Sequence, residues 1–325
     1  MKKYLLKRLV MIFPLLLGIS IICFGVMHLA PGKPTDMETM LNPRSSAEAQ
    51  ARMTVMYGLD KPLYEQYWLW LQRAITLDFG KSFSTDRRPV IDKIAERLPV
   101  TIALNLGAMV VIFIIAVPLG VTAAIKQNSI FDNTVSVLLF LGLAVPSFWL
   151  ALILMRFFGV ELGWLPISGL RSLNHEYLSP LASILDFGKH LILPLFVAVF
   201  GGLAGLSRYM RSNMLEVIRQ DYITVARSKG ISENSIIFKH ALRNALLPVI
   251  TILGLSVPGL IGGSVILETV FALPGMGQLF YIAVMARDYP TIMGILVIGS
   301  LLTLLGNLLA DIAYAYADPR IRIAR

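Results

Sequence analysis

The stretch that decides the architecture is DYITVARSKGISENSIIFKHALRNALLP, residues 221–248, a polar and basic interruption between two long apolar runs. Tyr222, Val225 and Ala226 recur at helical spacing and are predicted to share one face of a short helix. Gly230 follows where a left-handed residue commonly ends a helix. The first part of the stretch therefore predicts a short helix that a glycine turn closes.

A second helix is predicted directly after this turn. Ser232 supplies an N-cap oxygen and Glu233 a first-turn acid, and the apolar spacing then continues toward Pro248. The stretch thus reads as helix, glycine turn, helix, which is typical of a docking platform. The alternative interpretation is an ordinary basic loop that only fixes membrane topology.

The composition predicts a polytopic membrane protein. Hydrophobic residues make up 56% of the chain, charged residues 15%, and the mean hydropathy is +0.71, which is too apolar for a soluble globule. The net charge of +9 lies largely beside apolar runs, so it indicates topology rather than nucleic-acid binding. A single cysteine, Cys23, and four scattered histidines form no disulfide framework and no metal-ligand pattern.

Six apolar runs are each expected to cross a membrane once. A run of about 20 residues is enough to span the hydrocarbon core. The predicted spans are residues 9–30, 100–125, 134–158, 190–206, 246–269 and 291–314.

Charge bias orients these spans. Residues 208–243 carry 7 Lys or Arg against 3 acids, which places them in the cytoplasm. Residues 31–98 carry 10 Lys or Arg against 9 Asp or Glu, and a long loop with such balanced charge is expected to be translocated. This loop includes a predicted amphipathic helix with Tyr64, Trp68 and Ile75 on its apolar face. We therefore expect cytoplasmic termini and three parts: an N-terminal transmembrane helix (1–30), an extracytoplasmic insert (31–98), and a five-helix core (99–325) with a cytoplasmic coupling loop (208–246).

Several residues inside the spans have two interpretations. Pro146 and Ser147 mark either a simple kink or a moving gate. Glu268 is either a structural carboxylate or a pore contact, because an acid in a membrane is costly unless it faces a partner or a watery cavity. Asn307 and Asp311 lie one turn apart, and they either hydrogen-bond to another helix or face the inner vestibule. Separately, Gly201, Gly202 and Gly205 predict close helix packing.

Motifs across the chain resemble one transporter family. The run Ala226-Arg227-x-Lys229-Gly230, with a later Leu-Pro, is similar to the "EAA" loop of ABC importer permeases in their dipeptide, oligopeptide and nickel (DppB/OppB-like) branch. Residues 268–277, Glu-x-Val-Phe-x-x-Pro-Gly-x-Gly, and the Asp-Pro-Arg ending at 318–320 resemble that branch as well. The broad family pattern Glu-Ala-Ala is replaced here by Thr224-Val225-Ala226, so only its last alanine matches.

The resemblance implies an all-α polytopic protein with six transmembrane helices, the type I (MetI-like) importer permease fold. It implies no catalytic residue and a loop that couples transport to a separate ATPase. The residues that it places in this coupling loop are Asp221, Tyr222, Thr224, Ala226, Arg227, Lys229, Gly230, His240, Arg243 and Asn244.

The resemblance also implies the partners. They are a second, homologous permease, two cytoplasmic ABC ATPases that bind ATP and Mg, an external solute-binding protein and a peptide-like solute, in the inner membrane of a bacterium and among its lipids. This chain is expected to hold no cofactor, because no complete Gly-x4-Gly-Lys-Ser/Thr phosphate loop occurs in it. The sequence leaves open the solute, the choice between homodimer and heterodimer and the pore lining, and import rests on the resemblance alone.

Two other function classes predict different features. An ion-coupled secondary transporter should show paired intramembrane charges at broken helices and an inverted repeat, and neither is evident. A membrane-embedded hydrolase needs a nucleophile beside its base, and no Gly-x-Ser-x-Gly motif or metal-ligand pair is present.

Overall fold

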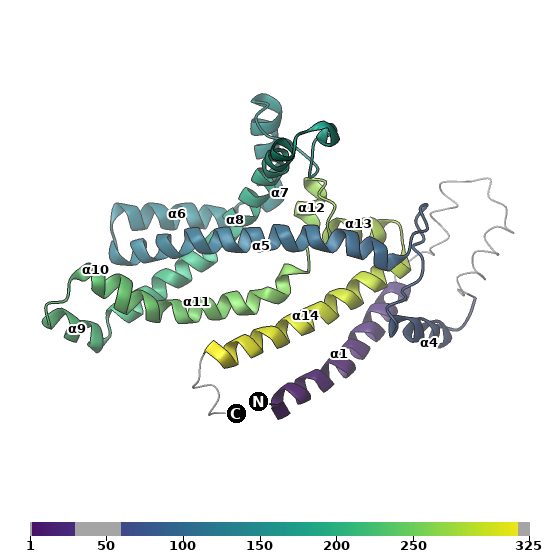
Figure 1. Ribbon diagram of the computed structural model, residues 1–325, viewed down its shortest axis with the longest axis horizontal. Helices are drawn as coiled ribbons and strands as arrows, with labels where there is room; N and C mark the ends of the chain where they lie inside the picture. Colours follow the sequence, from purple (N-terminus) through teal and green to yellow (C-terminus); the bar gives the residue numbers. More distant parts are fainter. Residues whose placement is uncertain (1, 30–59, 318–325) are drawn as a thin grey trace. The chain divides into compact units, whose positions relative to one another are not determined.

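The computed structural model describes residues 2–29 and 60–317, but not the side chains at 2–7, 311 and 313–317. In this part of the chain the regular elements are helices, together with one isolated β-bridge between Lys81 and Pro89 (Figure 1). The predicted all-α class is confirmed. Most of the first half of the insert (31–59) and the 318–320 ending lie outside the described residues.

Five helical segments are long and apolar enough to cross a membrane. A sixth candidate consists of two helices separated by a bend of 100°. The polytopic class is therefore confirmed, with six spans if the bent pair counts as one. The five are α1 (Lys2–Leu29), α5 (Val90–Ile125), α8 (Pro180–Ile218), the run Glu233–Leu260, and α14 (Tyr289–Ala317).

The span predicted over 134–158 corresponds to the bent pair of helices, and its break at Pro146 is larger than the simple kink that was one of the two predictions. The α6 helix (Ile130–Ala144) ends before Pro146, and α7 (Ser147–Leu154) continues into the π-helix η1 (Met155–Glu161). Val145 is extended (φ −80°, ψ 122°), because the proline ring disfavours helical backbone in the residue before it. The break is consequently a sharp turn and not a mild kink.

Other predicted boundaries move for local reasons. The α5 helix begins ten residues earlier than predicted. The α8 helix begins at Pro180, inside the predicted loop 159–189, because Ser179 caps it and proline is well suited to the first helical position. The fifth span ends at Leu260 instead of 269, and Gly263 has a left-handed φ of +64° before the separate helix α12 (Val265–Val270). The helix α13 (Met276–Met285), after the expected turn at Pro274 and Gly275, was not predicted.

The chain forms two compact units. The first contains residues 1–101, 261–265 and 274–325, so it includes α1, α13, α14, the start of α5 and the amphipathic helix α4 (Leu63–Ala74). In it α1 and α14 lie side by side (Figure 1). Its core gathers Phe79, Val90, Ile94, Met276, Leu279, Ile295 and Ile298.

A buried polar network joins the loop before α5 to the start of α14 in the first unit. The carboxylate of Asp288 accepts hydrogen bonds from Ser82 Oγ, from the Phe83 amide at 3.0 Å and from Thr291 Oγ1 at 2.7 Å. Lys93 Nζ donates to Ser82 Oγ at 2.9 Å. A buried carboxylate is tolerated only when it is hydrogen-bonded in this way, so the network fixes the loop.

The second unit contains residues 102–260 and 266–273. It holds most of α5, the α6–α7–η1 bend, α8, and the segments up to Leu260, and α8 packs against α6, α7 and the helix α11 (Leu242–Ser256). Asp132 near the start of α6 is 2% exposed and accepts a two-point ion pair from Arg211 of α8, with both N–O distances 2.7 Å. This unit carries the platform.

Glycines set how closely the helices of this unit approach. An added Cβ at Gly120 of α5 would lie 2.7 Å from Met210 Cβ and from the Ser207 carbonyl oxygen, both on α8. Among the three glycines predicted to serve close packing, only Gly202 meets a neighbour, at 2.4 Å from Ile112 Cδ1, whereas Gly201 and Gly205 face open space. Gly202 thus meets only the end of a flexible side chain, whereas Gly120, which the sequence did not single out, meets the backbone of α8.

Replacing Gly120 by alanine should destabilise the second unit, because the methyl group meets backbone that cannot yield easily. We expect a loss of about 1–3 kcal/mol, seen as a lower thermal midpoint of the detergent-purified protein. Gly205→Ala is the matched control, since its methyl group has free space. Equal midpoints for the two variants would contradict the close contact.

Candidate functional site

The platform, residues 221–248, begins with α9 (Asp221–Ser228), a helix with one buried and one exposed face. Ile223 is fully buried (0% exposed) and Ala226 is buried beside it. Both belong to a cluster that includes Met210 and Met214 of α8. The side of α9 that faces the protein is therefore held by apolar packing.

The turn after α9 has the predicted left-handed glycine. Gly230 has φ +75°, and its amide donates to the Arg227 carbonyl at 3.0 Å. The Ile231 amide donates to the Ala226 carbonyl at 3.3 Å, which completes a Schellman motif. Ile231 packs on the same apolar cluster, so the turn is closed by hydrogen bonds and by burial.

Arg227 and Glu233 form a two-point ion pair across this turn. Arg227 Nε and Nη2 donate to the two carboxylate oxygens at 3.1 and 2.6 Å. These hydrogen bonds to the Glu233 carboxylate raise the pKa of the Arg227 guanidinium further above its ordinary value. Ser232 is the N-cap as predicted, but its side chain makes no capping bond. The ion pair is exposed, so it orients the two sides of the turn more than it stabilises the fold.

The second helix of the platform is continuous with a membrane-spanning run, as predicted. The short α10 (Glu233–Ser235) leads into the π-helical turn η3 (Ile236–Ala241) and then α11. Its inward side chains join the cluster that holds α9. They are Ile236, Ile237, Ala241, Ala245 and Val249. Figure 1 shows α9 and α10 at one end of the helices of this unit.

The outward surface of the platform combines apolar and charged side chains. Tyr222 is 43% exposed, Val225 51% and Phe238 60%. Asn244 Nδ2 donates to the Tyr222 hydroxyl at 2.7 Å, which ties α9 to α11. Polar and charged side chains of the same segment are exposed as well: Asp221, Thr224, Arg227, Lys229, Lys239 and Arg243. A surface that exposes large apolar side chains together with charged ones is typical of a protein-docking surface.

The structure brings together the residues predicted for the coupling loop. Asp221, Tyr222, Thr224, Arg227, Lys229, Gly230, Arg243 and Asn244 are exposed, His240 is half-buried, and Ala226 is buried. Their role in coupling stays a prediction. The predicted shared face of Tyr222, Val225 and Ala226 is not the one that packs inward, because Ile223 pairs with Ala226 there.

Three residues of this surface were missed as site residues. Ile223 anchors α9, Glu233 pairs with Arg227, and Phe238 is exposed beside them. The spacing of Ile223 and Ala226, three residues apart, is a helical signal that could have identified the anchor. The ion pair has no such signal, since it depends on the fold of the turn.

The residues predicted for a pore or gate are divided between the two units. Pro146 and Ser147 are exposed at the break before α7, and Glu268 is 1% exposed in α12. Asn307 is half-buried in α14 of the other unit, and the Asp311 side chain lies outside the described part. Their roles stay predictions. Within residues 2–29 and 60–317, no group of three or more His, Cys, Asp or Glu is placed to hold a metal ion.

Comparison with known proteins gives matches over the whole chain. A family model described as the binding-protein-dependent transport system inner membrane component matches residues 116–323, and a model of the N-terminal part of such membrane components matches residues 1–105. The solved structure of the inward-facing MetNI methionine ABC transporter is similar at 18% identity and a TM-score of 0.49, over 68% of this chain and 96% of that one.

Three curated relatives illustrate the similarity. The chain is 46% identical to the oligopeptide transport system permease protein AppB of Bacillus subtilis, over 99% of each chain. It is 42% identical to a putative peptide transport system permease protein of Brucella abortus, over 99% of each. It is 38% identical to the dipeptide transport system permease protein DppB of Alkalihalophilus pseudofirmus, over 99% of this chain and 100% of that one.

Gly230→Val should loosen α9, because a β-branched residue is strained at the φ of +75° that the turn requires. We expect faster amide hydrogen exchange along residues 223–231 in the purified protein, with little change in α8. Gly230→Asn is the control, since asparagine tolerates the left-handed region. Unchanged exchange in the valine variant would contradict the importance of this turn.

Proposed function

Because the chain belongs to the family of binding-protein-dependent transport system inner membrane components, we propose that it is one permease subunit of an ABC importer for peptides or related small solutes. The observation that carries this proposal is the platform: an exposed apolar and charged surface on a helix that is rigidly seated in a membrane-spanning unit. The names of the relatives, which are permeases of oligopeptide and dipeptide transport systems, support a peptide-like solute.

The platform is the surface that an ATPase subunit binds. Tyr222, Val225 and Phe238 supply the apolar contact, and Arg227 and Lys229 supply charges around it. ATP and Mg are bound by two such ATPase subunits in the cytoplasm, and this chain has no phosphate-binding loop of its own. The energy of ATP hydrolysis therefore acts on this chain through its contacts with the ATPase subunits, and not through a reaction that the chain catalyses.

The packing of α9 supports a lever mechanism. Ile223 and Ala226 are inserted among side chains of α8, which has 39 residues and is thus about 58 Å long. A displacement of α9 by the closing ATPases moves the inner end of α8 with it. The ATPases shift the permease between inward-open and outward-open states because they contact the platform differently in each state.

The remaining partners follow from the same assignment. A second, homologous permease completes the pathway, and an external solute-binding protein delivers the solute to the side opposite the platform. Both chain ends lie in the cytoplasm, as the basic bias of residues 208–243 supports, and the membrane is the inner membrane of a bacterium. No other cofactor and no nucleic acid take part.

The proposal is tested by purifying this chain in detergent with the proteins encoded beside it. We expect two ATPase chains and one similar permease to co-purify, and peptide-loaded binding protein to stimulate ATP hydrolysis in proteoliposomes. A chain that purifies alone and transports solute with an ion gradient as the driving force and without ATP would overturn the proposal and favour a secondary transporter.

Val225→Asp should separate the ATPase subunits from the permease. It places an unpaired carboxylate at the centre of the docking surface, so we expect association to weaken by at least about tenfold and transport to fall with it. Gln127→Asp, an exposed position on the turn between α5 and α6, introduces the same charge outside the platform and should leave binding unchanged. Immobilised ATPase subunits and titrated permease give the affinities. Similar affinities for both variants would place the docking surface elsewhere.

A further inference from the structure

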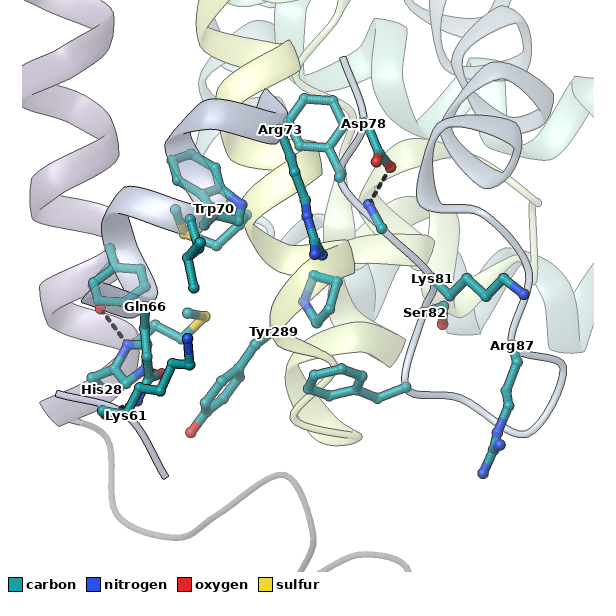
Figure 2. A pocket seen from close by; sticks show the side chains of 18 residues that line it. His28, Lys61, Gln66, Trp70, Arg73, Asp78, Lys81, Ser82, Arg87 and Tyr289 are labelled. Carbon is teal, nitrogen blue, oxygen red and sulfur yellow. Dashed lines mark hydrogen bonds between the residues drawn. The ribbon is translucent and has the colours of Figure 1, made fainter. Parts of the chain in front are cut away.

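A cavity of about 600 Å³ lies in the first unit, at the end of α1 that is opposite its N-terminus. It is bounded by α1, α4, the loop before α5, and the start of α14. Figure 2 shows the Arg73 side chain extending from α4 into the space that has Trp70 and Tyr289 on one side and Lys81 and Ser82 on the other. The platform belongs to the other unit, so this cavity is separate from the coupling site.

Positive charge dominates the lining of the cavity. Among the lining residues that the structure describes, four side chains are cationic, Lys61, Arg73, Lys81 and Arg87, and one is acidic, Asp78. Asp78 already accepts a hydrogen bond from the Gly80 amide at 2.9 Å, and Lys61 is paired with Glu65 at 2.7 Å. Within the part of the chain that the structure describes, the side chains of Arg73, Lys81 and Arg87 have no hydrogen bond or ion pair. The charge is therefore available to an anion.

The rest of the lining is aromatic and apolar. It includes Phe24 and Met27 of α1, Trp70 of α4, and Tyr289 and Met293 of α14. Other side chains at the same end of α1 are exposed and apolar: Val26 is 63% exposed and Leu29 85%. Aromatic residues and long cationic side chains commonly occupy the level of the lipid headgroups at the end of a membrane helix.

The helix α4 gives the cavity a fixed wall beside α1. Tyr67 and Ser20 share a hydrogen bond of 2.8 Å between their hydroxyl groups, and His28 Nε2 lies 3.3 Å from Gln66 Oε1. Tyr64, Trp68 and Ile75 are exposed on the rest of α4. An amphipathic helix with exposed Trp and Tyr that is fastened to the end of a membrane helix is placed at the membrane surface.

We propose that this cavity binds an anionic phospholipid, with the headgroup phosphate at Arg73 and one acyl chain along Phe24 and Met27. Arginine suits this ligand because its planar guanidinium donates two parallel hydrogen bonds to phosphate oxygens. The surplus of cations favours a lipid with net negative charge over a zwitterionic one. A peptide is a poorer match, since Asp78 is the one acid that its ammonium group would meet among the described lining residues.

The bound lipid would bridge α4 to the loop at residues 78–87 and to the start of α14, two parts that the Asp288 network already joins to each other. Its phosphate neutralises Arg73, and its acyl chain fills the apolar floor. Occupancy should consequently stabilise the assembly. This inference requires only that α1 spans a membrane, and its test needs neither ATP nor a transported solute.

The test uses the delipidated, detergent-solubilised assembly and native mass spectrometry. Titration with phosphatidylglycerol should give saturable binding and a higher thermal midpoint, and phosphatidylcholine should bind more weakly. Equal binding of the two lipids would overturn the proposal. If inorganic phosphate alone reproduced the thermal shift, the cavity would be a site for free anions and the lipid assignment would be wrong.

Variants locate the site. Arg73→Gln should weaken phosphatidylglycerol binding about tenfold, because a charge-assisted hydrogen bond is lost, and Arg73→Lys should retain part of the affinity. Arg88→Gln is the matched control: Arg88 is an exposed cation near the same loop that pairs with Glu96 and does not line the cavity. Equal lipid affinity in Arg73→Gln and Arg88→Gln would overturn the assignment of Arg73.

Discussion

The burial of Ile223 and Ala226 is the constraint on which the rest of the platform depends. These two side chains sit in one apolar cluster with residues of α5, α8, η3 and α11, so the short α9 helix has no independent position. A helix of eight residues is marginal in water by itself, because nucleation costs more than so few hydrogen bonds return. Tertiary packing therefore makes α9 a helix, and the same packing ties its movement to that of the spans.

The elements that the sequence predicted well are those whose signal is local. Gly230 could be identified because one backbone conformation follows from its place after a helix, and α4 because its apolar spacing is regular. The number of apolar runs could also be predicted, since a helix needs a minimum length to cross a membrane. The residues at which these helices end could not be predicted. Hydropathy stays high through Val145 and through 261–269, yet Pro146 and Gly263 break the helices there.

The candidate site shows the same division. The platform could be located from its polar interruption, and its exposed residues were largely named in advance. The inward face could not be chosen with certainty from eight residues, because Tyr222 with Val225 and Ile223 with Ala226 have the same helical spacing. The Arg227–Glu233 pair and the Asn244–Tyr222 bond join residues that only the folded turn brings together.

A buried charge ties α6 to α8 in the unit that carries α9. Asp132 is almost fully buried and meets Arg211 in a two-point pair, at the end of α8 that leads to α9. Removing one partner of such a pair typically costs about 3–5 kcal/mol, because the other charge is left without compensation. The apolar cluster beneath α9 and this ion pair act on neighbouring turns of α8, so both α6 and α9 are held to the same part of that helix. The helical continuity of α6 ends at the break at Pro146, where the chain bends by 100°.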